Sequence, residues 1–216
     1  MFHKILSFLF PDKCVLCRKI LENNESDICH HCRANAPEFI HGKKSIPFVA
    51  EWTAVWYYKD NVRNSLLRYK FYNARNYAAV YGRHLAMKLL QNNTCFDILT
   101  WVPISCSRKL RRGYDQVELI SKAVGKELGV SPIPTLKKIR NTPPQSNLAD
   151  PSARRANILG AYRALDCDSI RGKRILILDD VITTGSTVSE CAKTLLVSGA
   201  SEVICAAVAA ASKDKK

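Results

Sequence analysis

The sequence lacks any hydrophobic run long enough to cross a membrane. Its longest apolar stretch, residues 203–211, has the length of a buried strand and falls well short of the roughly 18 residues that a spanning helix needs. Residues 1–10 faintly resemble a signal peptide, but the apolar part is shorter than the typical ~7 to 15 residues and no small-residue cleavage site follows. We therefore expect a cytoplasmic protein that is not an integral membrane protein, with residues 1–10 forming a helix packed on the domain.

Acidic residues are scarce. The chain has 19 Asp and Glu against 33 Lys and Arg, which gives a formal net charge of +14. Such an excess favours partners that carry phosphate, although basic residues also serve simply to solvate a surface. Charge alone does not decide between these two interpretations.

The sequence also lacks an internal repeat and a secretory signal, and its cysteine count of nine is odd. Thiolates and metal ligands are therefore expected before disulfides. Four cysteines crowd into the first 32 residues, whereas the other five are scattered singly. We predict two units, a small zinc-binding module over residues 1–45 and a larger domain over residues 46–216.

The clustered cysteines form two Cys-x-x-Cys knuckles that are separated by eleven residues. Each short spacing lets two sulfurs reach one tetrahedral ion, and four thiolates leave no position for water, which predicts a structural Zn²⁺. The short gap between the knuckles leaves open that His30, His31 or His41 replaces a sulfur. Reactive or disulfide-bonded cysteines are the alternative. The predicted ligands are Cys14, Cys17, Cys29 and Cys32.

Strand-like and helix-like periodicities alternate after residue 45. The predicted strands are 48–56, 97–102, 175–178 and 202–209, and the predicted helices are 78–89, 117–128 and 187–198. The segment 132–152 contains five prolines and is expected to be a long loop, either functional or disordered. The strand, helix, strand order at the C-terminal end is a βαβ unit, so we predict an α/β domain with a mainly parallel sheet flanked by helices.

Two adjacent acids, Asp179 and Asp180, follow the predicted strand 175–178 and precede a turn of small hydroxyl residues. Backbone N–H groups of residues 183–187 and the N-terminus of the next helix suit a phosphate, and Gly185 permits a close approach. Carboxylates at the carboxyl edge of a parallel sheet can accept hydrogen bonds from paired sugar hydroxyls. A phosphate and a diol together indicate a ribose 5-phosphate. A chance strand-to-helix turn with acidic capping is the alternative.

This string resembles the phosphoribosyl pyrophosphate loop of type I phosphoribosyltransferases. The resemblance implies their Rossmann-like fold, Mg²⁺ bound with phosphoribosyl pyrophosphate, and catalytic roles for Asp179 and Asp180, which would hold the ribose 2′ and 3′ hydroxyls. It also implies that residues 183–187 hold the 5′-phosphate. The predicted ligand contacts in this string are Asp179, Asp180, Val181, Ile182, Thr183, Thr184, Gly185, Ser186 and Thr187.

A second predicted strand, 97–102, also ends in a small-residue loop, and four cations follow within five positions. By the same resemblance, residues 104–107 bind the pyrophosphate and nearby cations compensate its charge. A solvated basic turn is the alternative. The proline-rich segment that ends in Arg154 and Arg155 is a candidate lid. The predicted pyrophosphate contacts are Ser105, Arg108, Lys109 and Arg112.

Together with the knuckles and the string Leu67-Arg-Tyr-Lys-Phe71, these stretches resemble the signature of the ComF family over nearly the whole chain. The resemblance implies a zinc-ribbon-like module fused to a phosphoribosyltransferase fold, and a role with the DNA-uptake machinery during natural transformation. Cations interleaved with aromatic residues suit single-stranded DNA, which makes Arg68, Lys70 and Arg75 candidate contacts. Aromatic residues at helical spacing are, however, more often core residues.

An active phosphoribosyltransferase of nucleotide metabolism, with an amine or nucleobase acceptor, is the alternative function. The sequence nominates no acceptor-binding residue and no general base. Pyrophosphate release that requires an added acceptor would distinguish this enzyme from a DNA-binding protein, whose affinity should fall steeply with salt.

Overall fold

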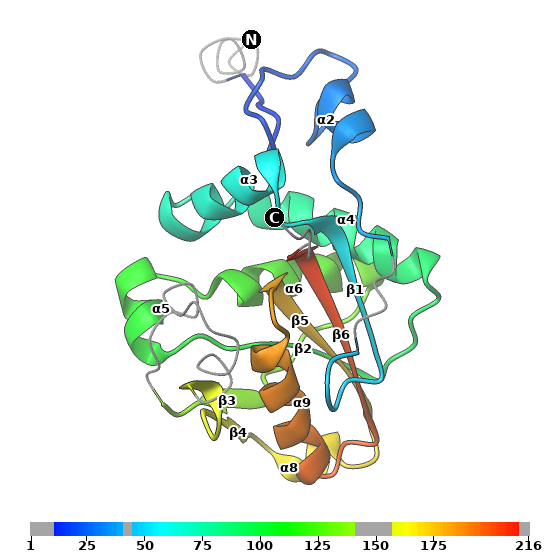
Figure 1. Ribbon diagram of the computed structural model, residues 1–216, viewed down its shortest axis with the longest axis vertical. Coiled ribbons are helices and arrows are strands. Elements are labelled where there is room, and N and C mark those ends of the chain that lie inside the picture. The colour runs from blue at the N-terminus through cyan, green and yellow to red at the C-terminus, as the bar shows by residue number, and fades with distance from the viewer. Residues whose placement is uncertain (1–10, 41–44, 141–156, 212–216) are drawn as a thin grey trace.

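The computed structural model describes residues 11–40, 45–140 and 157–211. Its centre is a parallel four-stranded sheet in the order β1-β6-β5-β2 (Figure 1). The strands are β1 (Glu51–Tyr57), β2 (Ile98–Trp101), β5 (Arg174–Ile182) and β6 (Glu202–Ala210). The two central strands, β5 and β6, are almost continuously apolar because helices cover both faces of the sheet.

Alternate residues of β5 enter two separate hydrophobic clusters. Leu176 and Leu178 pack with α3 (Asp60–Phe71), α4 (Tyr77–Gln91) and α6 (Gln116–Leu128) on one face. Ile175 and Ile177 pack with α9 (Ser186–Val197) on the other face. This alternation decides which neighbours each of the following residues of β5 meets.

A short antiparallel pair of strands, β3 (Leu136–Lys138) and β4 (Tyr162–Ala164), lies outside the main sheet. We call it the hood. Thr135 donates its hydroxyl to Thr100 Oγ1 at 2.9 Å, and the Gly160 N–H donates to Glu190 Oε1 at 2.7 Å. These bonds tie the hood to β2 and to α9. Three short helices complete the elements: α2 (His30–Asn35), α5 (Cys106–Arg112) and α8 (Cys167–Ile170).

The N-terminal module of residues 11–40 lies above α3 in Figure 1. Val15, Leu16 and Ile28 share a hydrophobic cluster with buried residues of α3 and α4. The module thus packs on the domain, while the division at residue 45 stays a prediction. Within the described part of the chain, every helix is too short or too polar to cross a membrane. The predicted helix of residues 1–10 lies outside the described residues.

The three predicted helices and the strands 97–102 and 202–209 are confirmed to within about two residues. The predicted strand 48–56 begins only at Glu51, and Phe48 lies outside it with φ 67° and half its surface exposed. Residues 53–56 of β1 are all buried, so the expected one-sided alternation is wrong for this strand. The predicted loop 132–152 contains β3, and residues 141–152 lie outside the described part. Helix α3 was not predicted.

Candidate functional site

The four predicted zinc ligands come together in one cluster. Their sulfurs all lie within 4.8 Å of one another, and the Sγ atoms of Cys17 and Cys29 are 3.6 Å apart. Four sulfurs about 2.3 Å from one tetrahedral ion would be separated by about 3.8 Å, so the cluster fits Zn²⁺. Nδ1 of His30, one of the alternative ligands, instead lies 3.2 Å from Glu25 Oε1.

The local backbone favours thiolates in this cluster. Cys29 caps α2, and its Sγ accepts the Cys32 N–H at 3.5 Å, while Cys17 Sγ accepts the Lys19 N–H at 3.5 Å. Burial opposes ionisation of Cys14, yet its pKa lies below the usual range because backbone N–H groups point at the sulfur. Burial instead raises the pKa of Cys17 and of Cys32. Metal-binding cysteines must be deprotonated, so a bound cation would supply the positive charge that four buried thiolates need.

Helix α3 attaches the metal module to the domain. Arg68 Nη2 donates to the carbonyl oxygens of Val15 at 3.0 Å and Leu16 at 2.6 Å, and Ser65 Oγ donates to Val15 O at 2.6 Å. These two carbonyls lie between the first two cysteines. Arg68, predicted as a DNA contact, therefore already holds the first knuckle.

The predicted ribose carboxylates lie within β5, which continues past them to Ile182. Asp180 faces α3 and α6, where Lys70 Nζ lies 2.8 Å from Oδ1 and Gln116 Nε2 donates to Oδ2 at 3.2 Å. Asp179 accepts the Asp180 N–H at 2.8 Å. Asp179 and Asp180 are only 9% and 5% exposed, so the surrounding structure largely covers both acids.

Electrostatics distinguish the two acids. Burial raises the pKa of Asp179 well above its usual range, and the neighbouring charge of Asp180 raises it further. Lys70 acts in the opposite direction, but its ion pair is with Asp180. The arrangement therefore penalises a charge on Asp179.

The loop after β5 leads directly into the N-terminus of α9. Gly185 caps this helix with φ 81°, and a Cβ built there would lie 3.0 Å from Cγ1 of the buried Ile46, so both backbone and packing require glycine. Thr184 Oγ1 lies 2.8 Å from Ser186 Oγ. The structure brings hydroxyls and the positive end of a helix together, as a phosphate site requires.

The other residues of the predicted string have different surroundings. Thr183 is exposed and Thr187 partly so. Val181 and Ile182 pack against the clusters on the two faces of the sheet, and both pair with β6. Their side chains belong to the core, so only their backbone is left to serve a ligand.

The predicted pyrophosphate loop is shorter than expected, because α5 begins at Cys106. Ser105 is the buried residue before this helix, and its Oγ lies 3.2 Å from Ser107 Oγ. The Ile104 N–H donates to Oδ2 of Asp115, which also caps α6. The loop is therefore held against the start of α6.

The predicted pyrophosphate cations diverge along α5. Lys109 Nζ pairs with Glu118 Oε2 at 2.9 Å, and the Arg112 guanidinium lies 5.2 Å from the ring centroid of Phe71. Arg108 is half-buried, and burial followed by the charge of Arg112 lowers its pKa. Of the three, only Arg108 interacts electrostatically with the hood, through Tyr162.

Helices α3 and α5 form one basic and aromatic surface. Phe71 and Tyr72 are 62% and 77% exposed, and the Arg75 guanidinium lies 4.5 Å from the ring centroid of Tyr114. Among the described residues, no ion pair involves Arg75, Arg111 or Arg112. We call this the α3–α5 surface, made up of Phe71, Tyr72, Arg75, Arg111 and Arg112.

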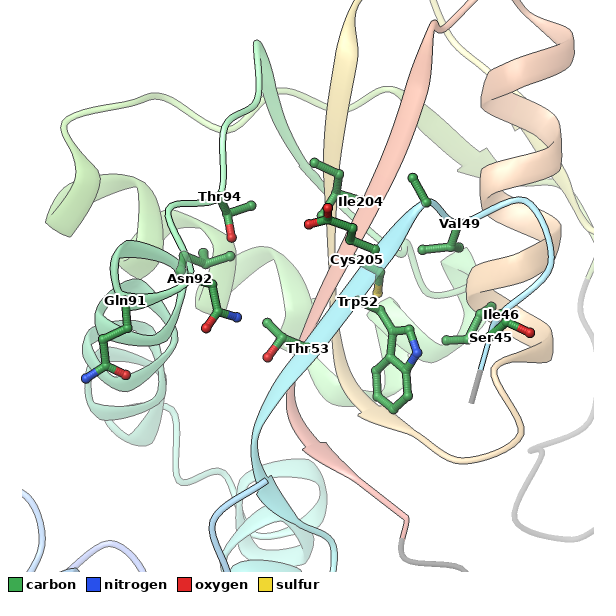
Figure 2. Close-up of a pocket in the computed structure, with 13 residues that line it drawn as sticks. Ser45, Ile46, Val49, Trp52, Thr53, Gln91, Asn92, Thr94, Ile204 and Cys205 are labelled. Atoms are coloured by element: carbon green, nitrogen blue, oxygen red, sulfur yellow. The ribbon is translucent and has the colours of Figure 1, made fainter. Parts of the chain in front are cut away.

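Two hollows in the described structure lie away from the acidic pair. One, of about 720 Å³, follows the edge strand β1, with Thr53 and Asn92 on the α4 side and Trp52 and Ile46 on the other (Figure 2). Among the described residues that line it, Glu51 is the only charged one, so this lining does not suit a phosphate. The second, of about 650 Å³, lies between the metal module and helices α3 and α4. Neither is lined by the β5 acids.

Two residues near the acidic pair were missed as site residues, namely Gln116 and Lys138. The Gln116 contact with Asp180 spans 64 residues, and no local pattern marks it. Lys70 was assigned to DNA, yet it contacts Asp180 across 110 residues. In the sequence Lys70 lies between Tyr69 and Phe71, and this local pattern gave no indication of the Asp180 partner.

Comparison with known proteins agrees with this architecture. The model of the phosphoribosyl transferase domain family matches residues 119–216, and that of the double zinc ribbon domain family matches residues 5–44. The first match covers the hood, the acidic pair and the phosphate loop, and the second covers the cysteine cluster. The chain thus has a phosphoribosyltransferase domain, with its parallel sheet and flanking helices, and an N-terminal zinc ribbon.

Several curated proteins are similar to the chain. Competence protein F of Haemophilus influenzae is 24% identical over 218 residues, which cover 90% of this chain and 95% of that protein. Competence protein ComFC of Streptococcus pneumoniae is 28% identical over 69% of this chain and 64% of its own length. DNA utilization protein YhgH of Salmonella typhi is 36% identical over 50% of this chain, which spans only 46% of that relative. Competence protein F and ComFC are homologues of this chain.

Proposed function

We propose that this protein binds phosphoribosyl pyrophosphate with Mg²⁺ at the end of β5 and acts on single-stranded DNA in the cytoplasm, together with the DNA-uptake machinery. The names of the homologues, competence protein F and DNA utilization protein, support the role in DNA uptake. One observation carries the ligand assignment: the Asp179-Asp180 pair leads into a glycine-capped helix N-terminus at the carboxyl edge of a parallel sheet.

The chain's own residues would divide the ligand between them. Hydroxyls and backbone N–H groups at the start of α9 would bind the 5′-phosphate, and the acids would accept hydrogen bonds from the ribose hydroxyls. Lys70 and Gln116 hold Asp180 in place, and a carboxylate with two donors still has lone pairs for a sugar. Mg²⁺ prefers oxygen ligands and would neutralise diphosphate charge near these carboxylates.

Calorimetry with phosphoribosyl pyrophosphate and Mg²⁺ tests this assignment. We expect the wild-type protein to bind and the double variant Asp179→Asn, Asp180→Asn to lose binding. Asp168→Asn is the matched control, because this carboxylate is 93% exposed and pairs only with Arg171. Unchanged affinity in the double variant would refute the ribose assignment.

The α3–α5 surface supports contact with single-stranded DNA. Exposed aromatic rings beside cations allow bases to stack while the backbone phosphates meet positive charge. Of the three predicted DNA contacts, Arg75 lies on this surface, whereas Arg68 and Lys70 have partners in the metal module and at Asp180. A strand would therefore use Arg75 with the neighbouring α5 cations, and Arg68 and Lys70 only if they exchanged partners.

Oligonucleotide binding at several salt concentrations tests the DNA assignment. The double variant Phe71→Ala, Tyr72→Ala should lose about 10-fold or more in affinity, since stacking contributes about 1–3 kcal/mol per base. Arg75→Met with Arg112→Met should reduce the salt dependence. Leu110→Ala, at an apolar side chain of α5 that is 84% exposed, is the control. If the DNA affinity is independent of salt and unchanged in both double variants, this surface is not the DNA-binding site.

Catalytic transfer is the second candidate function, and the hood beside the acidic pair favours it. In that reaction the bond from ribose C1 to diphosphate oxygen breaks, a bond from C1 to an acceptor nitrogen forms, and the nitrogen loses a proton to solvent. Catalysis would rest on positioning and charge neutralisation. Pyrophosphate release that depends on one added amine or nucleobase would establish the transferase. Its absence with every acceptor, despite tight ligand binding, would favour the binding protein.

A further inference from the structure

Lys138 is a buried lysine that neither the acidic pair nor the DNA surface explains. On β3 the side chains alternate, with Leu136 and Lys138 buried and Lys137 exposed. Lys138 is only 8% exposed, and its Nζ lies 5.2 Å from the ring centroid of Tyr162 on β4. Lysines are almost never fully buried unless they are paired, because removing the ammonium from water is costly.

The described residues supply Lys138 with no ion pair. Four charged or titratable groups, each from a different element, act on its amine: Tyr162 of β4 is in contact, and Arg108 of α5, Asp179 of β5 and Cys191 of α9 act through their charge. The ammonium is therefore within electrostatic reach of both the helix predicted to serve the pyrophosphate and the first acid of the pair. The hood bonds to Thr100 and Glu190 fix it there.

Two cations, Arg108 and Lys138, thus act on each other electrostatically, and burial lowers the pKa of both. Burial lowers the pKa of Lys138 to about 8, and the charge of Arg108 lowers it further, whereas Asp179 has the opposite effect. Two cations repel each other strongly in a poorly solvated region, and a polyanion that binds between them offsets this repulsion. A neutral acceptor molecule would not provide this compensation.

We propose that Lys138 binds the diphosphate group of phosphoribosyl pyrophosphate from the hood, together with Arg108 of α5. This inference rests on the proposed function. It gives the hood a contact with the ligand in addition to the contacts predicted at β5 and α5. The diphosphate would lie between α5 and the hood, with the ribose on the β5 acids and the 5′-phosphate at α9.

Binding should be linked to a proton. Above about pH 8 part of the Lys138 population is neutral in the free protein, and a diphosphate beside it favours the ammonium. The complex should therefore take up protons near pH 8 to 8.5, and affinity should fall as the pH rises through this range. Ribose 5-phosphate, which lacks the diphosphate, should bind without this uptake.

Calorimetric titration of the full chain with two ligands tests the proposal. Lys138→Met should weaken phosphoribosyl pyrophosphate binding in the presence of Mg²⁺ by about 10- to 100-fold, the usual size of a lost charge-assisted contact, and leave ribose 5-phosphate affinity unchanged. Lys137→Met, one residue along on the exposed side of β3, should change neither. Lys138→Arg should restore much of the affinity, and proton uptake should disappear, because arginine stays charged.

The outcomes separate this inference from the proposed function. If the wild-type protein binds both ligands and Lys138→Met binds both equally well, Lys138 does not contact the diphosphate. If Lys138→Met loses affinity equally for both ligands, Lys138 acts on the ribose phosphate part or on the fold, and the proposal is also overturned. If the wild-type protein binds neither ligand, the proposed function itself fails. Thermal unfolding shows whether the variants fold. Removal of a buried lysine that has no ion pair within the described part of the chain should leave the melting temperature unchanged or higher.

Discussion

The metal module and the proposed ribose-phosphate site are both built from converging side chains, but the residues of the second lie much farther apart in the sequence than those of the first. The four metal ligands all lie between residues 14 and 32. The partners of Asp180 lie 64 and 110 residues away from it. A site formed within one short segment depends mainly on its own spacing, whereas a site assembled by the fold depends on every element that positions it.

Helix α3 connects the two regions. Its Arg68 holds carbonyls between the first two cysteines, and two residues later Lys70 reaches Asp180. Because the same helix contacts both regions, a substitution in one should also affect the other. The size of that second effect measures the coupling through α3.

Removal of the metal should have the largest effect. The module has little core of its own, and structural Zn²⁺ contributes on the order of 10 kcal/mol of binding free energy to such folds. We expect zinc to be present in protein purified without added metal, and chelation to lower the melting temperature markedly. The variant Cys14→Ser, Cys17→Ser should behave like the chelated protein, while Cys95→Ser, at an exposed single cysteine, should not.

Zinc-free protein that melts like the wild type would show that the four thiols serve another purpose. A melting curve in which only the module unfolds, with ligand binding at β5 intact, would show that α3 does not transmit the loss.

Loss of the Lys70 ammonium should have the next largest effect. Lys70→Met leaves Asp180 buried with Gln116 as its remaining side-chain donor. Breaking a buried ion pair at one partner is strongly destabilising, so we expect a loss of about 3 kcal/mol in the free energy of unfolding, together with weaker ligand binding. Denaturant titration measures the first and calorimetry the second.

Lys122→Met is the matched control for that variant, because Lys122 pairs with Glu118 on the surface and is 59% exposed. Its effect should stay below about 1 kcal/mol. Equal effects of the two substitutions would mean that the Lys70 pair has no special role in holding Asp180.

The same contrast explains what could be predicted from the sequence. The cysteine spacing, the helical periods and the acidic pair are local patterns, and they located the cysteine cluster, α4, α6, α9 and the turn between β5 and α9. The partner of Lys70 could not be predicted, because the position of α3 beside β5 depends on packing of the whole domain. Likewise, alternation on β1 failed because the strand is covered on both faces rather than one.

The hood shows the same limitation at Lys138. The prolines of segment 132–152 indicated a loop, yet three residues within it form β3 and one of them buries an ammonium. β3 has only 3 residues, so its alternation of buried and exposed side chains is too short to recognise from the sequence. Its burial follows from the bonds that hold the hood on β2 and α9, which join distant parts of the chain.

Replacement of the first acid should change stability in the opposite direction. The pKa of Asp179 in the folded protein is raised above its unfolded value of 3.8 by burial and by Asp180. The folded state therefore holds the proton more tightly than the unfolded state, so this group favours folding at low pH and opposes it increasingly as the pH rises above about 4. Asp179→Asn removes that penalty. We expect the variant to be more stable than the wild type at pH 8, with a difference that fades toward pH 4, while ligand binding is lost.

Denaturant titration across that pH range measures the difference, and Asp168→Asn, at an exposed carboxylate, should show none. A variant that is less stable at pH 8 would mean that Asp179 supports the fold, as the cysteines do in the metal module. A more stable variant would mean that β5 retains a destabilising acid for its ligand, which is the trade-off expected of a functional site. The sign of the stability change in Asp179→Asn therefore compares the two regions. If the variant is less stable, the regions differ only in how far apart their residues lie in the sequence. If it is more stable, they also differ in what those residues contribute to stability.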